Sequence, residues 1–480
     1  MSSKNVLPDI SLCDPSEDLL PFLQQIVLES KSKRKRLYCS VTLETGYFDP
    51  LAILEGINNP RDSNCYMEKP ADEFSIACGE SVAKASFSGS DRFTKARIWS
   101  DELLMHTRNA GKLALSGSGP THFLSATFET EKRSDDSPDP LHIFFPRWQV
   151  LRKGGVHLLT VNAEINPFSS PSKLKEELDE SICQIKGMRY EQPRSSIINS
   201  TKFDSPMENL NYLDAVRKAL CEIHSGKLSK IVLARQLHYD TKCEISSFSI
   251  AHLLRDRYPD CFTFCLSTPN KGTMVGATPE TLLRVSGSNL ETEAIAGSAP
   301  RGPSAGRDAL WGKTLLGQEK AIHEHRLVIE SIIRRLASIG LTNSMECKTR
   351  LLRLANLQHM RTPIRAKLAN GIHPFDALDA LHPTPAMGGT PREEAIPLIR
   401  KLEKTSRGWY SGVAGWMDGR GHGEFIVPIR CGKITPSNLT LYAGAGVVDG
   451  SVPEQEKIET DWKLEAMLEV ITGRTNLIGE

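Results

Sequence analysis

Glutamates on two segments of helical periodicity are the side chains whose spacing first indicates chemistry. In residues 318–338 (QEKAIHEHRLVIESIIRRLAS), Glu324 falls on the same predicted helical stripe as Val328. In residues 453–471 (PEQEKIETDWKLEAMLEVI), Glu456 and Glu459 lie one turn apart. Burying such charges is costly unless a cation compensates them, and hard oxygen ligands suit Mg²⁺. The spacing thus suggests a magnesium site, while exposure of these glutamates at the border of an amphipathic helix remains the alternative.

A lysine and a further glutamate stand at strand ends. Lys230 opens the predicted strand KIVLARQLHY (230–239) and shares a face with Val232 and Ala234, so desolvation would favour its proton-accepting form. Glu280 follows a turn in GATPETLL (276–283), where a strand end could direct a carboxyl group into a cleft. Both residues are candidates for general acid–base catalysis. The alternative is that Lys230 only packs in its strand and that Glu280 is exposed to solvent.

Glycine clusters offer backbone N–H groups that could bind an anion. They stand in AIAGSAPRG (294–302), in HPTPAMGGTP (382–391) and at Gly444 and Gly446 in LYAGAGVVDG (441–450). The last cluster has neither the spacing nor the following helix of a dinucleotide-binding loop, and the sequence contains no P-loop. Such N–H groups near Arg430 could bind a carboxylate. Packing in the core or in a strand is the alternative for Trp409, Tyr410 and Arg430.

The elements that must position these residues follow from the hydrophobic patterns. Up to residue 170, short β-branched and aromatic runs such as EFSIACGE and THFLSATFE predict a sheet-rich half. The polar stretch 190–209 indicates a linker or a long surface loop. A helix over 212–226, several strands and the two glutamate-bearing helices then alternate irregularly. The pattern predicts a mixed α/β protein with largely antiparallel sheets.

Composition narrows the class of protein. The 480 residues correspond to about three domains or to one large α/β domain. With 59 Lys and Arg against 58 Asp and Glu, the net charge of +1 argues against a general nucleic-acid binder, and we interpret the basic run 31–36 as a solvated connection. No apolar run is long enough to cross a membrane and the first residues do not resemble a secretion signal, so we expect no membrane association and a cytoplasmic location. The eleven scattered cysteines indicate reduced thiols.

Read together and in order, these segments resemble the chorismate-utilising enzymes, and among them the isochorismate synthases. The resemblance covers about residues 207–475, whereas the first 200 residues resemble the family only in general pattern, as in FFPRWQVL. It rests on collinear motifs that include LSKIVLARQ, GATPETLLR, AIAGSAPRG, HEHRLVIE, NLQHMRTPIRAKL, ALHPTPAMGGTP, RGWYSGVAGWMD, FIVPIRCGKI, YAGAGVV and EQEKIETDWKLEAM.

The resemblance implies one large α/β (α+β) domain with two antiparallel sheets packed face to face, helices outside and the active site between the sheets. Residues 1–206 would form the N-terminal half of this sandwich, and residues 207–475 the chorismate-binding catalytic region. The stretch 190–209 would then be a loop inside one domain. A cut near residue 200 should therefore not give two independently folding parts.

Roles carry over from the family by position. Lys230 matches a general base that takes a proton from water attacking C2 of chorismate, and Glu280 matches a general acid that protonates the departing C4 hydroxyl. Positions that match the Mg²⁺ site are Glu324 and Glu459, with Glu456 as a nearby helper. Positions that match substrate contacts are Ser298, His359, Tyr410, Arg430, Gly444 and Gly446. The sequence departs from several relatives at Ala321, where they carry an acidic residue, which puts the outer hydration of the metal in doubt.

The choice within the family depends on two positions. Lys230 resembles the water-using members, because the ammonia-using anthranilate-type enzymes carry Gln there, and Ala296 replaces the lysine nucleophile of aminodeoxychorismate synthases. The resemblance thus implies reversible, Mg²⁺-dependent formation of isochorismate without ATP or a redox cofactor, and without an obligatory protein partner. Salicylate synthase, which goes on to eliminate pyruvate, and a noncatalytic chorismate binder remain alternatives. Whether the product serves menaquinone, a siderophore or salicylate stays open.

Overall fold

Two large sheets form the frame of the computed structural model, which describes residues 19–135, 137–188, 206–240 and 245–472. The first sheet has twelve strands in this part of the chain. In spatial order they are β18 (Gly389–Thr390), β10 (Lys230–Asp240), β22 (Asn438–Val448), β21 (Cys431–Ile434), β12 (Thr273–Thr278), β11 (Phe262–Ser267), β2 (Asn64–Lys69), β3 (Phe74–Gly79), β8 (Trp148–Lys153), β9 (Val156–Ile165), β1 (Leu37–Glu44) and β5 (Thr107–Gly111).

The second sheet has ten strands in the described residues. Their order is β15 (Met345–Glu346), β17 (Leu357–Lys367), β14 (Asn289–Pro300), β13 (Thr281–Ser286), β20 (Gly423–Ile426), β19 (Val413–Asp418), β6 (Thr121–Ala126), β7 (Leu141–Phe145) and β4 (Ala83–Phe87), and β16 (Arg350–Arg353) pairs with β17. Within the described chain the pairings are antiparallel except that of β1 with β5. The prediction of largely antiparallel sheets is therefore confirmed.

Each half of the chain contributes one block of neighbouring strands to each sheet, and the two blocks meet at one strand pair. In the first sheet, β2 of the N-terminal half pairs with β11 of the C-terminal half. In the second sheet, β6 pairs in the same way with β19. The two halves thus share both sheets and form one α/β domain, as the resemblance implied.

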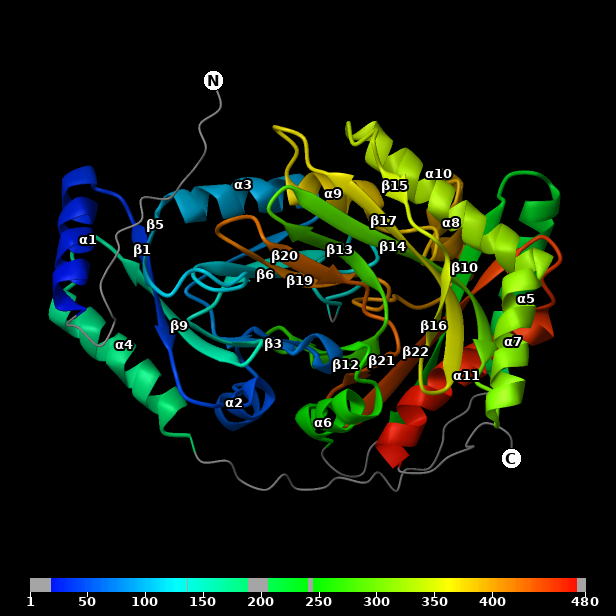
Figure 1. The fold of residues 1–480 in the computed structure, drawn as a ribbon, viewed down its shortest axis with the longest axis horizontal. Helices are drawn as coiled ribbons and strands as arrows, with labels where there is room; N and C mark the ends of the chain where they lie inside the picture. The colour runs from blue at the N-terminus through cyan, green and yellow to red at the C-terminus, as the bar shows by residue number, and fades with distance from the viewer. Residues whose placement is uncertain (1–18, 136, 189–205, 241–244, 473–480) are drawn as a thin grey trace.

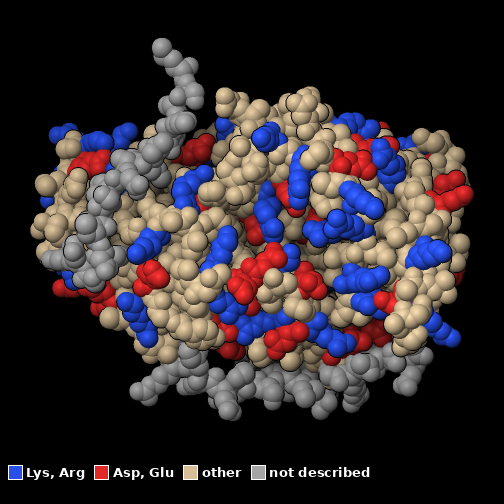
Figure 2. Space-filling model, viewed as in Figure 1, with Lys and Arg blue, Asp and Glu red and all other residues tan. Residues whose placement is uncertain are grey.

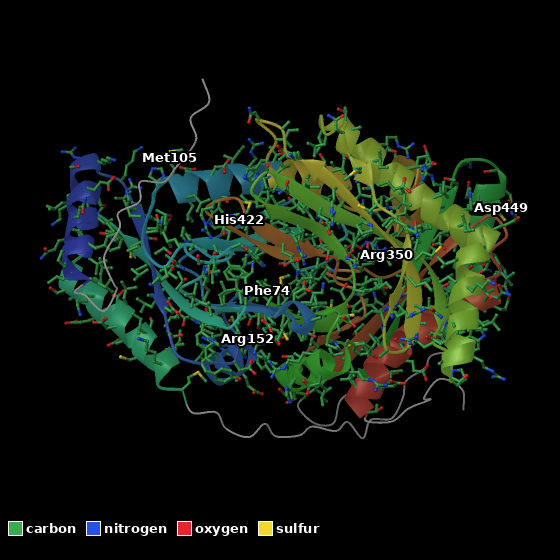
Figure 3. All side chains as sticks on the ribbon, viewed as in Figure 1. Phe74, Met105, Arg152, Arg350, His422 and Asp449 are labelled. Carbon is green, nitrogen blue, oxygen red and sulfur yellow. The ribbon has the colours of Figure 1, made fainter. Side chains whose placement is uncertain are left out.

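Aromatic residues fill the space between the sheets. Phe74 of β3 is labelled in Figure 3. Its ring stacks on that of Trp416 of β19, with centroids 5.9 Å apart and an interplanar angle of 21°. Phe123, Phe264 and Trp409 are buried in the same cluster. Burial of this apolar surface from two facing sheets is the main driving force that holds them together.

Helices cover the outer faces of both sheets (Figure 1). Helices α1, α2, α4, α6 and α11 pack on the first sheet, α3, α8 and α9 pack on the second, and α5 and α10 pack against β10 and β22. Their bounds are α1 (Leu20–Lys33), α2 (Pro50–Ile57), α3 (Arg92–Met105), α4 (Pro171–Lys186), α5 (Pro206–His224), α6 (Ser247–Arg257), α7 (Ala305–Gly317), α8 (Glu319–Ser338), α9 (Pro374–Leu381), α10 (Arg392–Leu402) and α11 (Pro453–Thr472), with a 3₁₀ turn at Pro70–Asp72.

The helices differ from the sequence prediction in two places. The expected linker at 190–209 lies outside the described residues up to 205, and its last four residues belong to α5, which begins at Pro206 because proline is compatible with the first helical position. The sheet-rich half also contains α2 and α3. Helix α2 begins where Asp49 accepts a hydrogen bond from the Leu51 N–H (2.9 Å).

The molecular surface carries charges of both signs. Lysine and arginine side chains alternate with aspartate and glutamate over the face in Figure 2, so that face has no broad field of one sign. In the described residues no helix is long and apolar enough to cross a membrane.

Candidate active site

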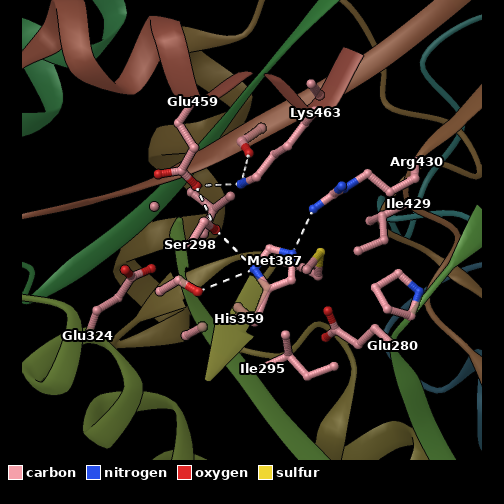
Figure 4. A pocket seen from close by; sticks show the side chains of 18 of the residues that line it. Glu280, Ile295, Ser298, Glu324, His359, Met387, Ile429, Arg430, Glu459 and Lys463 are labelled. Atoms are coloured by element: carbon pink, nitrogen blue, oxygen red, sulfur yellow. Dashed lines mark hydrogen bonds and ion pairs between the residues drawn. The ribbon is translucent and has the colours of Figure 1, made fainter. Parts of the chain in front are cut away.

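One pocket collects ten of the eleven residues that the sequence singled out. Its walls come from both sheets and from helices α8 and α11 (Figure 4). The ten residues are Lys230, Glu280, Ser298, Glu324, His359, Tyr410, Arg430, Gly444, Gly446 and Glu459. Glu456 is not among the residues that line it.

The chain passes from one sheet to the other at two points of this pocket. Pro279 and Glu280 connect β12 of the first sheet to β13 of the second, and residues 427–430 connect β20 back to β21. The Val427 N–H donates to the Glu280 carbonyl (3.1 Å), and the Ala277 N–H donates to the Arg430 carbonyl (3.1 Å). These paired crossings place Glu280 and Arg430 between the sheets.

Lys230 forms an ion pair with Glu324 inside the pocket. The lysine side chain on β10 is 1% exposed, and its Nζ lies 2.9 Å from Oε1 of Glu324 on α8. Gly446 leaves room for this pair, because a Cβ atom there would lie 2.5 Å from that carboxylate oxygen and 3.0 Å from Cε of the lysine and would displace them. An ammonium group held in this ion pair has no lone pair with which to accept a proton from water.

Glu280 is buried and is held in its protonated form near neutral pH. Burial and the nearby carboxylate of Glu293 raise its pKa to about 8, against the opposing effect of Lys230, Lys463 and Arg430. The apolar side chains Ile295 and Ile429 line the same part of the pocket (Figure 4). A protonated carboxyl group among apolar side chains can donate a proton to a leaving group.

His359 is a neutral hydrogen-bonding link. Its Nε2 accepts a hydrogen bond from Nη2 of Arg430 (3.0 Å), so the proton lies on Nδ1, which faces the Gly297 carbonyl (3.2 Å) and Ser298 Oγ (3.1 Å). Burial, together with Arg430 and Lys463, lowers its pKa to about 3. A bulge at Gly297, where φ is +74°, sets Ser298 opposite His359 on the neighbouring strand.

Glu459 carries its charge beside a lysine that the sequence analysis missed. Lys463 Nζ donates to Glu459 Oε1 (2.6 Å) and to the Gly444 carbonyl (2.8 Å), and Ser298 Oγ donates to the same carboxylate oxygen (3.3 Å). Burial acts to raise the pKa of Glu459, but Lys463 outweighs it and the pKa is lowered. The spacing of four residues along α11 was the signal that could have identified Lys463.

The aromatic residues of RGWYSG divide between two roles. Trp409 is 1% exposed and belongs to the core between the sheets, so packing is the correct interpretation for it. Tyr410 lines the pocket, where its ring stacks on Tyr442 with centroids 5.3 Å apart. A Cβ atom at Gly444 would lie 3.2 Å from the Tyr410 hydroxyl, so this glycine allows the hydroxyl to approach β22.

The two glutamates expected as metal ligands share the pocket, whereas the expected helper does not line it. Glu324 and Glu459 both line the pocket, whereas Glu456 is buried one turn away on α11 and pairs with Lys320 Nζ at 2.7 Å. Across the described residues, no group of three or more His, Cys, Asp or Glu side chains could hold a metal ion. Two carboxylates on separate helices still fit Mg²⁺, which binds through one or two carboxylates and takes its other oxygens from water and substrate.

Comparison with known proteins identifies the family of the chain. The profile described as "Chorismate binding enzyme" matches residues 22–472. The chain is 38% identical over 269 residues to the salicylate biosynthesis isochorismate synthase of Pseudomonas aeruginosa, a match that covers 56% of each protein. It is 28% identical over 454 residues to isochorismate synthase MenF of Bacillus subtilis, over 93% of this chain and 96% of that one.

A solved structure has the same fold. The menaquinone-specific isochorismate synthase MenF of Escherichia coli matches 95% of this chain and all of its own, with a TM-score of 0.75 and 22% sequence identity. The two-sheet architecture is therefore the architecture of chorismate-utilising enzymes.

Proposed function

The chain belongs to the chorismate-binding enzyme family, and we propose that it is an isochorismate synthase that converts chorismate reversibly to isochorismate. The observation that carries this proposal is the presence, in one pocket, of a buried lysine and a buried carboxyl group whose pKa is about 8. These are the base and the acid that addition of water and loss of a hydroxyl group require. Two relatives named above carry the same activity in their names.

The proposed reaction moves two protons. Water attacks C2 of the ring while the neutral amine of Lys230 accepts a proton from it. The ring double bonds shift, the C4–O bond breaks, and Glu280 donates its proton to the leaving hydroxyl, which departs as water. The substrate and product differ by the position of one hydroxyl group, so the step needs neither ATP nor an oxidant. Proton return from lysine to glutamate, through solvent, restores the starting state.

Other pocket residues would bind the carboxylates of the substrate. Arg430 is buried, and its Nη2 donates to His359, which leaves further N–H groups of the guanidinium for an anion. The Tyr410 hydroxyl and the backbone between Gly444 and Gly446 line the same cavity. Lys463 adds a second cation on the side of α11. A substrate with two carboxylates would therefore meet two cationic side chains, Arg430 and Lys463, in this pocket.

Magnesium is part of the proposal through its two pocket carboxylates. Glu324 and Glu459 would hold the ion, and when bound it would neutralise and orient a substrate carboxylate. Glu456 would act indirectly, through its ion pair with Lys320 in the first turns of the same helices. If Glu324 held the ion, it would no longer pair with Lys230. Glu324 therefore connects the proposed base to the proposed cation site.

Incubation with chorismate tests the proposal directly. Purified protein is given chorismate with Mg²⁺, with EDTA, and without any ammonium salt, and the products are identified by chromatography and proton NMR. We expect Mg²⁺-dependent isochorismate in equilibrium with chorismate. Salicylate with equimolar pyruvate would instead assign salicylate synthase, and binding without turnover in the presence of Mg²⁺ would refute an enzymatic function for this pocket.

A further inference from the structure

Arg407 joins two walls of the pocket without lining it. Its side chain is 1% exposed and lies just before β19. Nη1 donates to the Met387 carbonyl (2.8 Å), and Nη2 donates to the Val232 carbonyl (2.8 Å). Met387 and Val232 both line the pocket, from segments more than 150 positions apart in the sequence. One guanidinium group therefore fixes the separation of these two walls.

Glu403 connects Arg407 to β10, the strand that carries Lys230. Arg407 Nε donates to Glu403 Oε2 (2.8 Å), and the Ala234 N–H donates to Glu403 Oε1 (2.8 Å). The short strand β18 pairs with β10 only at Lys230 and Ile231. Beyond that point the edge of β10 would have unpaired backbone groups, and the Arg407–Glu403 pair satisfies two of them. The ion pair therefore holds the strand that carries Lys230.

The N-terminal half of the chain holds Arg407 in place. Its backbone N–H donates to Glu129 Oε1 (3.1 Å), and its guanidinium carbon lies 4.1 Å from the ring centroid of Phe128. The Phe128 N–H donates to the Gly408 carbonyl (2.9 Å). Arg92, which is also buried, donates to the carbonyls of Thr127 and Glu129 and so fixes this segment from its other side. Residues 127–129 directly follow β6.

We propose that Arg407 is a positioning residue for the active site, and that residues 127–129 of the N-terminal half act on catalysis through it. The Tyr410 N–H donates to the Arg407 carbonyl (3.0 Å), so the same turn also sets the position of a pocket tyrosine. Loss of this support would let β10, the Met387 segment and Tyr410 shift relative to one another. The kinetic part of the proposal rests on the proposed function, whereas its structural part does not.

Arg407→Lys is the first test. Lysine keeps the positive charge, but its single nitrogen cannot reach Glu403, Val232 and Met387 together. We expect kcat/KM for chorismate to fall by about 10- to 100-fold, with a higher KM, because misplaced groups lose the geometry that catalysis needs. A kcat/KM within twofold of the wild-type value would overturn the proposal.

Glu129→Ala tests the contribution of the N-terminal half against a matched control. Asp418 at the other end of β19 is also a buried acid between the halves, and its Oδ2 accepts the Gly117 N–H (3.0 Å) far from the pocket. We expect Glu129→Ala and Asp418→Ala both to lower the melting temperature, but only Glu129→Ala to raise KM. Equal kinetic effects of the two variants would contradict a positioning role.

Hydrogen exchange separates this proposal from the proposed function. In Arg407→Lys and Glu129→Ala, amides of residues 230–234 and 386–389 should exchange at least about tenfold faster than in the wild type, while Asp418→Ala leaves them protected. This readout needs no turnover. Unchanged exchange in both variants would refute the positioning role even if the protein makes isochorismate, and faster exchange would support it even if chorismate is not the substrate.

Discussion

Two carboxyl groups in one pocket are held in opposite protonation states. Burial and Glu293 raise the pKa of Glu280 to about 8, whereas Glu459 keeps its charge because Lys463 outweighs the effect of burial. Glu280 lies at a crossing between the sheets with apolar neighbours, and Glu459 lies on a helix with a lysine one turn further along. Their surroundings thus suit Glu280 to the proposed role of proton donor and Glu459 to the proposed role of cation ligand.

Replacement of the proposed base tests the role of Lys230. We expect Lys230→Gln to lower isochorismate formation by about 10²- to 10⁴-fold, because the amide cannot accept the proton from water. Added ammonium salt should allow weak amination, since ammonia needs no base. Product analysis by chromatography checks both outcomes, with Lys367→Gln, an exposed lysine on β17, as the control. Full isochorismate formation by Lys230→Gln would eliminate the assignment.

The pH dependence of activity tests the role of Glu280. A general acid must be protonated, so kcat/KM should fall as pH rises through about 8. Glu293→Gln removes the neighbouring charge that helps to raise this pKa, and should therefore move the fall in activity to lower pH. If kcat/KM of Glu293→Gln falls at the same alkaline pH as that of the wild type, this account is contradicted.

Stability should change with pH for the same reason. The folded-state pKa of Glu280 is above its unfolded value of 4.5, so the native state binds more protons between pH 4.5 and 8 and loses stability as pH rises through this window. The neutral amide of Glu280→Gln removes this loss. We expect the variant to gain stability over the wild type, by several kcal/mol at pH 9 and much less at pH 5. Urea unfolding at both pH values measures the difference.

At the scale of elements, helices α8 and α11 determine how the pocket carboxylates face each other. Glu324 and Glu459 extend from the two helices, and one turn earlier along each helix Lys320 pairs with Glu456 at 2.7 Å. Burial and Glu459 raise the pKa of Glu456, while Lys320 opposes them. This ion pair therefore joins the first turns of the two helices.

Lys320→Met should be destabilising because it leaves the 3% exposed Glu456 side chain without its cation. Lys320 itself is 32% exposed, so solvent screens part of the effect, and we expect a loss of about 1–2 kcal/mol. Lys218→Met, in an exposed pair with Asp214, should cost less than about 0.5 kcal/mol. Denaturant unfolding measures both.

The double variant Lys320→Met/Glu456→Gln checks that the loss comes from the unpaired carboxylate. It should lose less stability than the sum of the two single variants, because the remaining partner is no longer a buried charge. Strict additivity would show that the pair does not couple the helices.

At the scale of the whole molecule, the pocket depends on both halves of the chain. Strand β2 pairs with β11 and strand β6 pairs with β19, so each half alone would have open strand edges and an uncovered apolar face. Residues 127–129 add a direct contact to Arg407. The first 200 residues, for which the sequence implied only completion of the sandwich, thus also contact Arg407, whose guanidinium binds two walls of the pocket.

Cleavage between the halves tests this dependence. With a protease site placed after residue 197, we expect the cleaved protein to stay folded as one particle, because the strand pairing survives. The separately expressed parts 1–197 and 198–480 should each lack a cooperative thermal transition. Size-exclusion chromatography and circular dichroism measure these outcomes. Independent cooperative folding of either part would show that the halves are separate domains.

The sequence by itself determined the local elements and the types of the chemical groups. The alternating and helical patterns predicted β10, α8 and α11 nearly to their ends, because these depend on neighbours along the chain. The collinear motifs also singled out ten residues that meet in one pocket. They did not reveal Arg407, whose partners are backbone carbonyls of distant segments and leave no pattern in the sequence.

Tertiary structure alone decided which of these groups touch and in what state. Side chains that are distant in the sequence form the Lys230–Glu324 and Lys320–Glu456 ion pairs. Burial in the folded protein is likewise the main cause of the raised pKa of Glu280. Spacing along a helix places a carboxylate on one face of that helix. The charged side chains of the elements that face it determine its protonation state and its ion-pair partner. The joining of the two halves was likewise visible only in the tertiary structure, where β2 pairs with β11 in the first sheet and β6 pairs with β19 in the second.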